Sequence, residues 1–139
     1  MNVVNHMDFT HFDLTLKNDA RRFECGTHNI PGIFGLGASL EMFLELGMEL
    51  VWGRIKGLTD RLVEGVQGKG YKVFSPRGEG EASGIVSFYS PTKNHVQLVK
   101  ELDGKGITVV ERGGRIRATP HFYQDISHIE ALVEALPGH

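Results

Sequence analysis

The sequence has little of several features that define a class of protein. It contains one cysteine, Cys25, in 139 residues, which excludes an internal disulfide and favours a reducing, cytoplasmic compartment. The net charge is −2 and the basic residues are scattered, so we expect neither nucleic acid nor a membrane as a partner. No apolar run is long enough for a membrane span, and the N-terminus lacks a signal-peptide pattern. Since 40% of the residues are hydrophobic, we expect one cytoplasmic globular domain.

Patterns for metal binding and nucleophilic catalysis are also missing. None of the seven histidines forms a His-x₃-His pair or has a cysteine at zinc spacing, so we expect no metal site. Cys25 precedes His28 by three residues, but one Cys-x-x-His in a loop is weak evidence for a nucleophile. The segment 32–37, G-I-F-G-L-G, lacks the Gly-Lys-Ser/Thr ending of a phosphate-binding loop. We therefore predict no catalytic residue in this chain.

The most informative stretch is 109–123, V-V-E-R-G-G-R-I-R-A-T-P-H-F-Y. Apolar residues stand on both sides of Gly113-Gly114, and paired glycines accept the positive φ angles of a tight hairpin turn. Arg115 and Arg117 are two residues apart, so they share one face of the second strand. A guanidinium on a strand can bind a carboxylate or phosphate with two hydrogen bonds. Spacing alone nevertheless favours two solvated arginines on an exposed sheet face.

Periodicity predicts an α+β fold. It indicates first an irregular arm, then a helix from Gly32 that is interrupted at Gly47, and a second helix that ends near Gly68. Strands at 71–75 and 85–89 follow, and then a helix that starts at Ser90-Pro91. The hairpin and a last helix capped by Asp125 end the chain. The second helix carries an apolar stripe of Val51, Ile55, Leu58, Leu62 and Val66. A small antiparallel or mixed sheet with helices on one face is a two-layer α+β sandwich.

The helix that follows Gly32 carries more apolar residues than one buried face of a small domain needs. They are Ile33, Phe34, Leu36, Leu40, Met42, Phe43, Leu44 and Leu46. An excess of this kind normally marks a surface that has a partner. We expect this helix to expose apolar surface and the chain to self-associate.

Two motifs, R-F-E-C-G-T-H-N at 22–29 and R-I-R-A-T-P-H-F-Y-Q-D at 115–125, resemble segments of the class V aminotransferases, a pyridoxal-phosphate family that includes cysteine desulfurases and kynureninase. R-F-E-C-G-T-H-N at 22–29 is similar to the family's R-F-E-x-G-T-x-N, which leads into the small domain. R-I-R-A-T-P-H-F-Y-Q-D at 115–125 is similar to the closing R-x-R-x-S-P-H-F-Y-N-T. The motifs stand in the family's order, and the resemblance extends from about Phe9 to Leu136.

The resemblance implies a role for five residues. Arg117 matches the arginine that binds the α-carboxylate of an amino-acid substrate, and Arg112 is a second substrate-side arginine. Thr27, with Gly26 beside it, matches the threonine that reaches the phosphate of pyridoxal 5′-phosphate in the neighbouring subunit of a homodimer. Asn29 belongs to the same motif.

Two departures from the family pattern limit the activity that we expect. The family's Schiff-base lysine typically follows a histidine, and no lysine of this chain does. Only G-G-R-I separates Arg112 from Arg117, where cysteine desulfurases carry a nucleophilic cysteine. The resemblance therefore implies a connector, 1–31, and a C-terminal small domain, 32–139, that is inactive alone. The parent enzyme is expected to be an aminotransferase, epimerase or lyase rather than a persulfide-forming desulfurase.

A non-catalytic, homodimerising, ligand-binding module is the alternative. An α+β sandwich with an open sheet edge can bind a ligand or a second copy without any cofactor. Such a module would not need the irregular arm, whereas a small domain inherits that arm from the interface with a large domain. The two hypotheses therefore differ in whether residues 1–31 are required.

Overall fold

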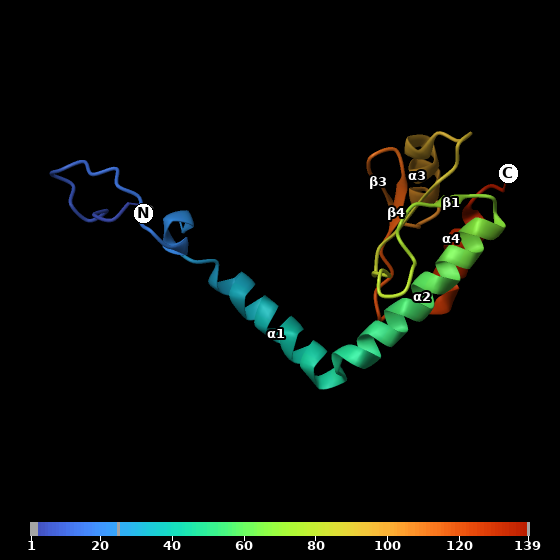
Figure 1. Cartoon of the computed structure of the whole chain (residues 1–139), viewed down its shortest axis with the longest axis horizontal. Helices are drawn as coiled ribbons and strands as arrows, with labels where there is room; N and C mark the ends of the chain where they lie inside the picture. The colour runs from blue at the N-terminus through green and yellow to red at the C-terminus, as the bar shows by residue number, and fades with distance from the viewer. Residues whose placement is uncertain (1–2, 25, 139) are drawn as a thin grey trace. The chain divides into compact units, whose positions relative to one another are not determined.

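The computed structural model describes residues 3–24 and 26–138 (Figure 1). Cys25, considered above as a nucleophile, lies outside the described residues. The chain divides into two compact units, Met1–Glu45 and Leu46–His139. The assignment of 1–31 to a connector and 32–139 to a small domain stays a prediction.

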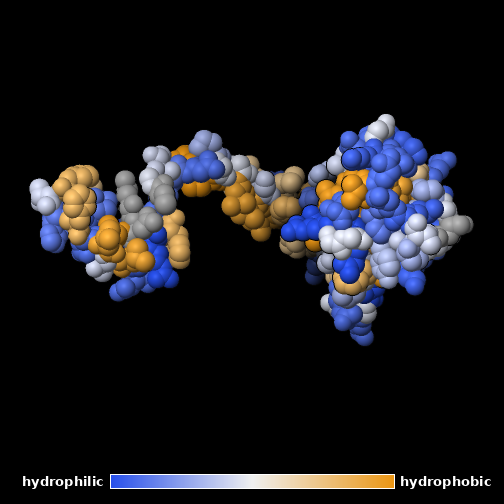
Figure 2. All heavy atoms as spheres, turned by 90° about the horizontal axis from the view of Figure 1, so that it is seen from above, coloured by the Kyte–Doolittle hydropathy of each residue, from blue (hydrophilic) through white to orange (hydrophobic). Residues whose placement is uncertain are grey.

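The first unit consists of an irregular arm and two helices. The helices are η1 (Ala20–Phe23), a 3₁₀ turn, and α1 (Ile30–Leu46). In the arm, Val3 and Leu16 form an isolated antiparallel bridge. Among the described residues of this unit none is buried, and most apolar side chains of α1 are exposed, up to 80% at Leu44. Figure 2 shows this apolar surface, which confirms the exposure predicted for the helix.

The second unit is a four-stranded sheet with helices on one face. Its elements are α2 (Met48–Gly68), β1 (Lys72–Val73), β2 (Val86–Tyr89), α3 (His95–Asp103), β3 (Val110–Glu111), β4 (Ile116–Ala118) and α4 (Ile126–Ala135). The strand order is β1-β2-β4-β3, and all three neighbouring pairs are antiparallel. The two-layer α+β sandwich predicted from the sequence is confirmed.

The core of the second unit lies between the sheet and its helices. Val86 and Phe88 on β2 and Ile116 on β4 are completely buried there. They pack with buried residues of the three helices, namely Leu58, Leu62, Val66, Leu98, Leu102, Ile129 and Leu132. Each large apolar side chain contributes about 1.5–3 kcal/mol when fully buried, so this face of the sheet fixes the strand register. The apolar stripe predicted for α2 is confirmed, with Ile55 half-buried.

The helix predicted to begin at Ser90-Pro91 begins at His95 instead. The side chain of Asn94 accepts a hydrogen bond from Gln97 N at 3.1 Å and forms the N-cap. Ser90 Oγ accepts from Thr92 N at 3.2 Å, and Ser90 N donates to His95 Nε2 at 2.9 Å. The prediction was wrong because the serine hydroxyl stabilises a turn before the helix, which is the usual competitor of an N-cap.

No single helix in the described part of the chain is long and apolar enough to cross a membrane. Helices α1 and α2 are long and apolar enough for a membrane span only when they are taken together, and the pair is broken at Gly47. Gly47 has φ 80°, a left-handed conformation that glycine adopts without the steric cost of a side chain. The interruption predicted at this residue is confirmed.

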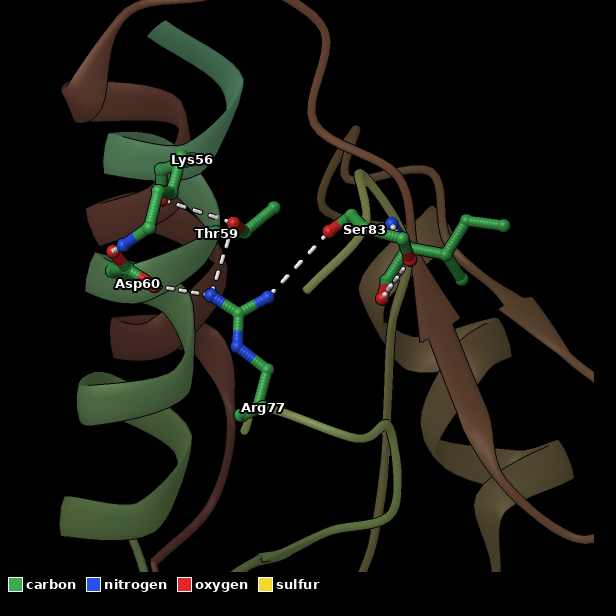
Figure 3. A network of polar contacts seen from close by, with 6 residues as sticks. Lys56, Thr59, Asp60, Arg77 and Ser83 are labelled. Carbon is green, nitrogen blue, oxygen red and sulfur yellow. Dashed lines mark hydrogen bonds and ion pairs between the residues drawn. The ribbon is translucent and has the colours of Figure 1, made fainter. Parts of the chain in front are cut away.

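A polar network fastens the turn after β1 to α2 (Figure 3). The Arg77 guanidinium, whose side chain is only 17% exposed, donates to the Asp60 carboxylate and to Thr59 Oγ1. Its other terminal nitrogen lies 3.5 Å from the Ser83 carbonyl oxygen. Lys56 donates to the second Asp60 oxygen at 2.6 Å. The hydrogen bond from Lys56, and then that from Arg77, lowers the pKa of Asp60.

We expect Asp60→Asn to lower the free energy of unfolding at neutral pH by about 1 kcal/mol, because two cations lose their carboxylate partner at a half-exposed site. The lowered pKa means that the charged carboxylate contributes stability at neutral pH, and that this stability is lost as the pH falls through the pKa of folded Asp60. Urea unfolding at neutral pH and at about pH 2 should show the difference from wild type shrink in acid. Glu64→Gln is the control, since Glu64 is exposed and lies 3.8 Å from Arg61. A difference that is independent of pH would contradict this role of Asp60.

Two glycines of α2 should respond oppositely to alanine. A Cβ at Gly65 would lie 2.5 Å from Val133 Cγ2, whereas a Cβ at Gly57 would have no atom within 4 Å among the described residues. We expect Gly65→Ala to destabilise the second unit by about 1–3 kcal/mol through overpacking against α4. We expect Gly57→Ala to stabilise it by about 0.5–1 kcal/mol through helix propensity. Thermal unfolding of both variants tests the close approach, and equal shifts would show that α2 and α4 do not meet at Gly65.

Candidate functional site

The hairpin of β3 and β4 has the tight turn that the sequence predicts. Gly113 and Gly114 have φ 60° and 76°, both in the left-handed region that a two-residue hairpin turn requires. Arg112 N donates to Arg115 O at 2.8 Å and closes the turn. The Glu111 carboxylate accepts a hydrogen bond from Gly114 N at 2.7 Å. The arginines on the two sides of the turn are therefore fixed to a rigid backbone.

The strand register places Arg117 on the sheet face opposite the helices, which we call the outer face. Ile116 and Ala118 of β4 are buried against the helices, at 0% and 5% exposure. Since successive side chains of a strand point to opposite faces, Arg117 lies on the outer face. Arg115 directly precedes β4 and falls on the same side if the alternation extends by one residue. In β2, Ser87 pairs directly with Arg117 and shares that face. This arrangement agrees with the shared face that spacing predicted for the arginines.

Arg117 is half-buried and has an unused donor. Its Nε atom is buried, and no acceptor for it exists among the residues that the structure describes. Buried side-chain donors in folded proteins almost always have a partner, and leaving one unpaired costs about 1–3 kcal/mol. A ligand carboxylate would satisfy this donor and one terminal nitrogen together. The orphaned Nε therefore fits the carboxylate-binding role that the resemblance implies.

Arg115 is held by an aromatic ring from another strand. Its guanidinium carbon lies 3.5 Å from the centroid of the Phe74 ring, and Nη1 donates to Gly113 O at 3.2 Å. Phe74 directly follows β1, and its N donates to Ser87 O at 2.8 Å. Because β2 separates β1 from β4, the Arg115 side chain spans the outer face of β2 to reach the ring. Sequence reasoning missed Phe74, since its contact with Arg115 depends on sheet order.

The hairpin arginines carry uncompensated positive charge. The ion pairs within the described residues involve Arg21, Arg54, Lys56, Arg61 and Arg77. None of them includes Arg112, Arg115 or Arg117. Arg112 is exposed beside the turn, and its role as a second substrate-side arginine stays a prediction. The outer face is therefore suited to an anionic ligand.

The three predicted phosphate-binding residues belong to the first unit. Gly26 has φ 69°, Thr27 is exposed, and the Asn29 side-chain oxygen accepts from Gly32 N at 3.1 Å. Asn29 thus caps the start of α1, which leaves its amide NH₂ to donate to a ligand. Helix α1 has 17 residues and no acidic residue in its first turn. The Thr27 hydroxyl and the Asn29 NH₂ group are donors that suit a phosphate group. The backbone N–H groups in the first turn of α1 already have acceptors within the chain.

A hollow of about 510 Å³ beside α2 is a weaker candidate. Trp52, Lys56, Arg77 and Glu79 line it with the glycines of the turn. Both cations of this hollow already bind Asp60. Their charge is used within the fold, unlike that of the hairpin arginines. In the described part of the chain, no group of three or more metal-ligating side chains is found.

Residues 3–128 match the model of the aminotransferase class-V family. The match covers most of the chain, so the chain belongs to this family. A probable cysteine desulfurase from Pyrococcus abyssi is 26% identical over 134 residues, which are 87% of this chain and 33% of the relative. The chain thus spans about a third of the length of the curated relatives it matches.

Solved structures of enzymes resemble the fold. The apo cysteine desulfurase of Thermococcus onnurineus has a TM-score of 0.74 and 26% identity, over 86% of this chain and 33% of its own. A cystine C-S lyase, solved with its reaction product cysteine persulfide, has a TM-score of 0.73 and 25% identity, over 90% of this chain and 34% of its own. These similarities agree with the mixed fold of the second unit and with the family assignment.

Proposed function

We propose that this chain is the small-domain part of a pyridoxal-phosphate enzyme that acts on an amino acid. Arg117 binds the α-carboxylate of the substrate, and Gly26, Thr27 and Asn29 bind the cofactor phosphate of a neighbouring subunit. The observation that carries this proposal is the buried Nε of Arg117, which has no acceptor among the described residues. Family membership supports the cofactor, and the rigid hairpin supports the carboxylate site.

Arg117 orients the substrate through two parallel hydrogen bonds. Its backbone is held in the central pair β2-β4, where it pairs with Ser87, and the buried Ile116 next to it prevents the strand from sliding. A fork of donors on a fixed strand binds a planar carboxylate in one orientation.

The cofactor would be held at its phosphate by residues 26–29. Their donors are the Thr27 hydroxyl and the Asn29 side-chain NH₂ group, since the Asn29 oxygen already accepts from Gly32 N. When bound, pyridoxal phosphate supplies an electron sink for bonds to the substrate α-carbon. The chain's own residues bind and orient around that chemistry, and the covalent lysine comes from outside the sequence described here. None of its seven lysines stands in the family's His-Lys context.

The reaction that we propose uses no persulfide on this hairpin. A two-residue glycine turn joins β3 to β4, and the stretch from Arg112 to Arg117 contains no cysteine. A nucleophilic cysteine needs a loop of its own between the arginines to reach a substrate. Transamination, epimerisation or elimination fits the hairpin better than sulfur transfer to it.

The exposed apolar side chains of α1 favour the second candidate, a homodimerising binding module. Phe34 and Leu36 are 76% and 61% exposed, and a second copy of the chain could cover them. The same surface serves the first candidate as well, because the proposed phosphate site is completed by a neighbouring subunit. Cofactor binding separates the two candidates, since a module without catalysis has no use for a phosphate site.

We expect Arg117→Gln to weaken binding of L-alanine by about tenfold or more, because one charged, two-pronged contact is removed. The ligand-induced shifts of backbone amides in β4, measured by NMR on the full chain, report the affinity. Arg61→Gln is the matched control, since Arg61 is an exposed arginine of α2. Equal affinity in both variants would remove Arg117 from the carboxylate site.

Pyridoxal phosphate with borohydride should label several exposed lysines weakly or none. The expected result follows because no lysine of this chain stands in the family's context. Intact mass and peptide mapping after reduction measure the labelling. One saturating adduct at a single lysine would mean that this chain builds a complete cofactor site.

A further inference from the structure

The hairpin carries a second anion-binding group next to the first. We propose that Arg115 binds the acidic side chain of the substrate while Arg117 binds its α-carboxylate, so that the substrate is an amino acid with a second acidic group. This inference rests on the role proposed for Arg117 and extends it to the class of substrate. It is carried by the position, the support and the charge of Arg115.

The two guanidinium groups have the right placement for one small ligand. Arg117 lies in β4 and Arg115 directly precedes that strand, and residues two apart in extended backbone are separated by about 6.7 Å. The buried Ile116 between them keeps both on the outer face. Across from Arg117 stands Ser87, a short side chain on the same face of β2. A ligand that contacts both guanidinium groups would meet Arg117 with one end and Arg115 with the other.

Phe74 positions the Arg115 guanidinium for this task. A guanidinium 3.5 Å above an aromatic ring lies in stacking contact with it. Stacking on Phe74 orders the Arg115 guanidinium, and its N–H groups point outward from the edge of the plane. Nη1 binds Gly113 O, so Nη2 and Nε remain for an acid. Less side-chain entropy is lost on binding when the arginine is already ordered in this way.

The charge of the outer face favours a ligand with two acidic groups. Arg115 and Arg117 have no carboxylate partner among the described residues, and Lys72 adds a third cation on this face, because it pairs with Tyr89 of β2. Neighbouring like charges repel each other. A ligand with one carboxylate would offset one guanidinium, whereas two acidic groups would offset both. Electrostatic complementarity therefore favours an amino acid of the aspartate or glutamate type.

The test compares acids with their neutral isosteres on the full chain. NMR titrations of the wild type would use L-aspartate against L-asparagine, and L-glutamate against L-glutamine, with the backbone amides of β4 as the readout. We expect at least one acid to bind about five- to tenfold more tightly than its amide, as one added charged contact implies. Equal affinity for acid and amide would overturn the inference.

Variants separate this inference from the proposal on which it rests. Arg115→Gln should reduce the acid-to-amide ratio to about one, whereas Arg117→Gln should weaken the binding of every amino acid. Phe74→Leu should lower the ratio partially, because Arg115 remains but is no longer positioned. If Arg117→Gln weakens the binding of L-alanine but the acids bind no more tightly than their amides, only the second subsite is wrong. If no amino acid responds to Arg117→Gln, the carboxylate site itself is wrong.

Discussion

The burial of Ile116 and Ala118 is the constraint on which the candidate site depends. These two residues of β4 pack against the helices, and the side chains of a strand alternate between its faces. A shift of the strand by one residue would bury both arginines and expose both apolar side chains. The free energy of core packing therefore also fixes the direction of Arg115 and Arg117. The same strand, β4, therefore contributes both to the stability of the core and to the proposed binding site.

Support for the outer face comes from polar and aromatic contacts at its borders. The Arg77–Asp60 network holds the turn that follows β1, and Phe74 in the segment just before that turn carries the Arg115 guanidinium. The glycine turn holds the same guanidinium, since Nη1 donates a hydrogen bond to Gly113 O. Two separate segments, the one that follows β1 and the glycine turn, thus contact one guanidinium, which is more support than a solvated surface arginine normally receives.

Local sequence signals predicted the elements, and tertiary contacts decided what the signals missed. Paired glycines, the helix break at Gly47 and the stripe of α2 depend on neighbours in the chain and were predictable. The start of α3 was not, because Ser90 is a good cap by composition but its hydroxyl binds Thr92 N instead. The contact of Phe74 with Arg115 requires the order β1-β2-β4, which no local pattern contains. The shared face of the arginines was predictable from period two, whereas their lack of a counter-ion needed the structure.

The central claim is that the buried Nε–H of Arg117 is reserved for a substrate carboxylate. The most direct measurement is the side-chain Nε–H resonance of Arg117 in the arginine-labelled full chain, assigned by its absence in Arg117→Gln. Addition of an amino acid should move this resonance in a saturable way, as expected when an unpaired donor gains a charged acceptor. A resonance that stays in place while the amino acid binds elsewhere on the chain would contradict the claim.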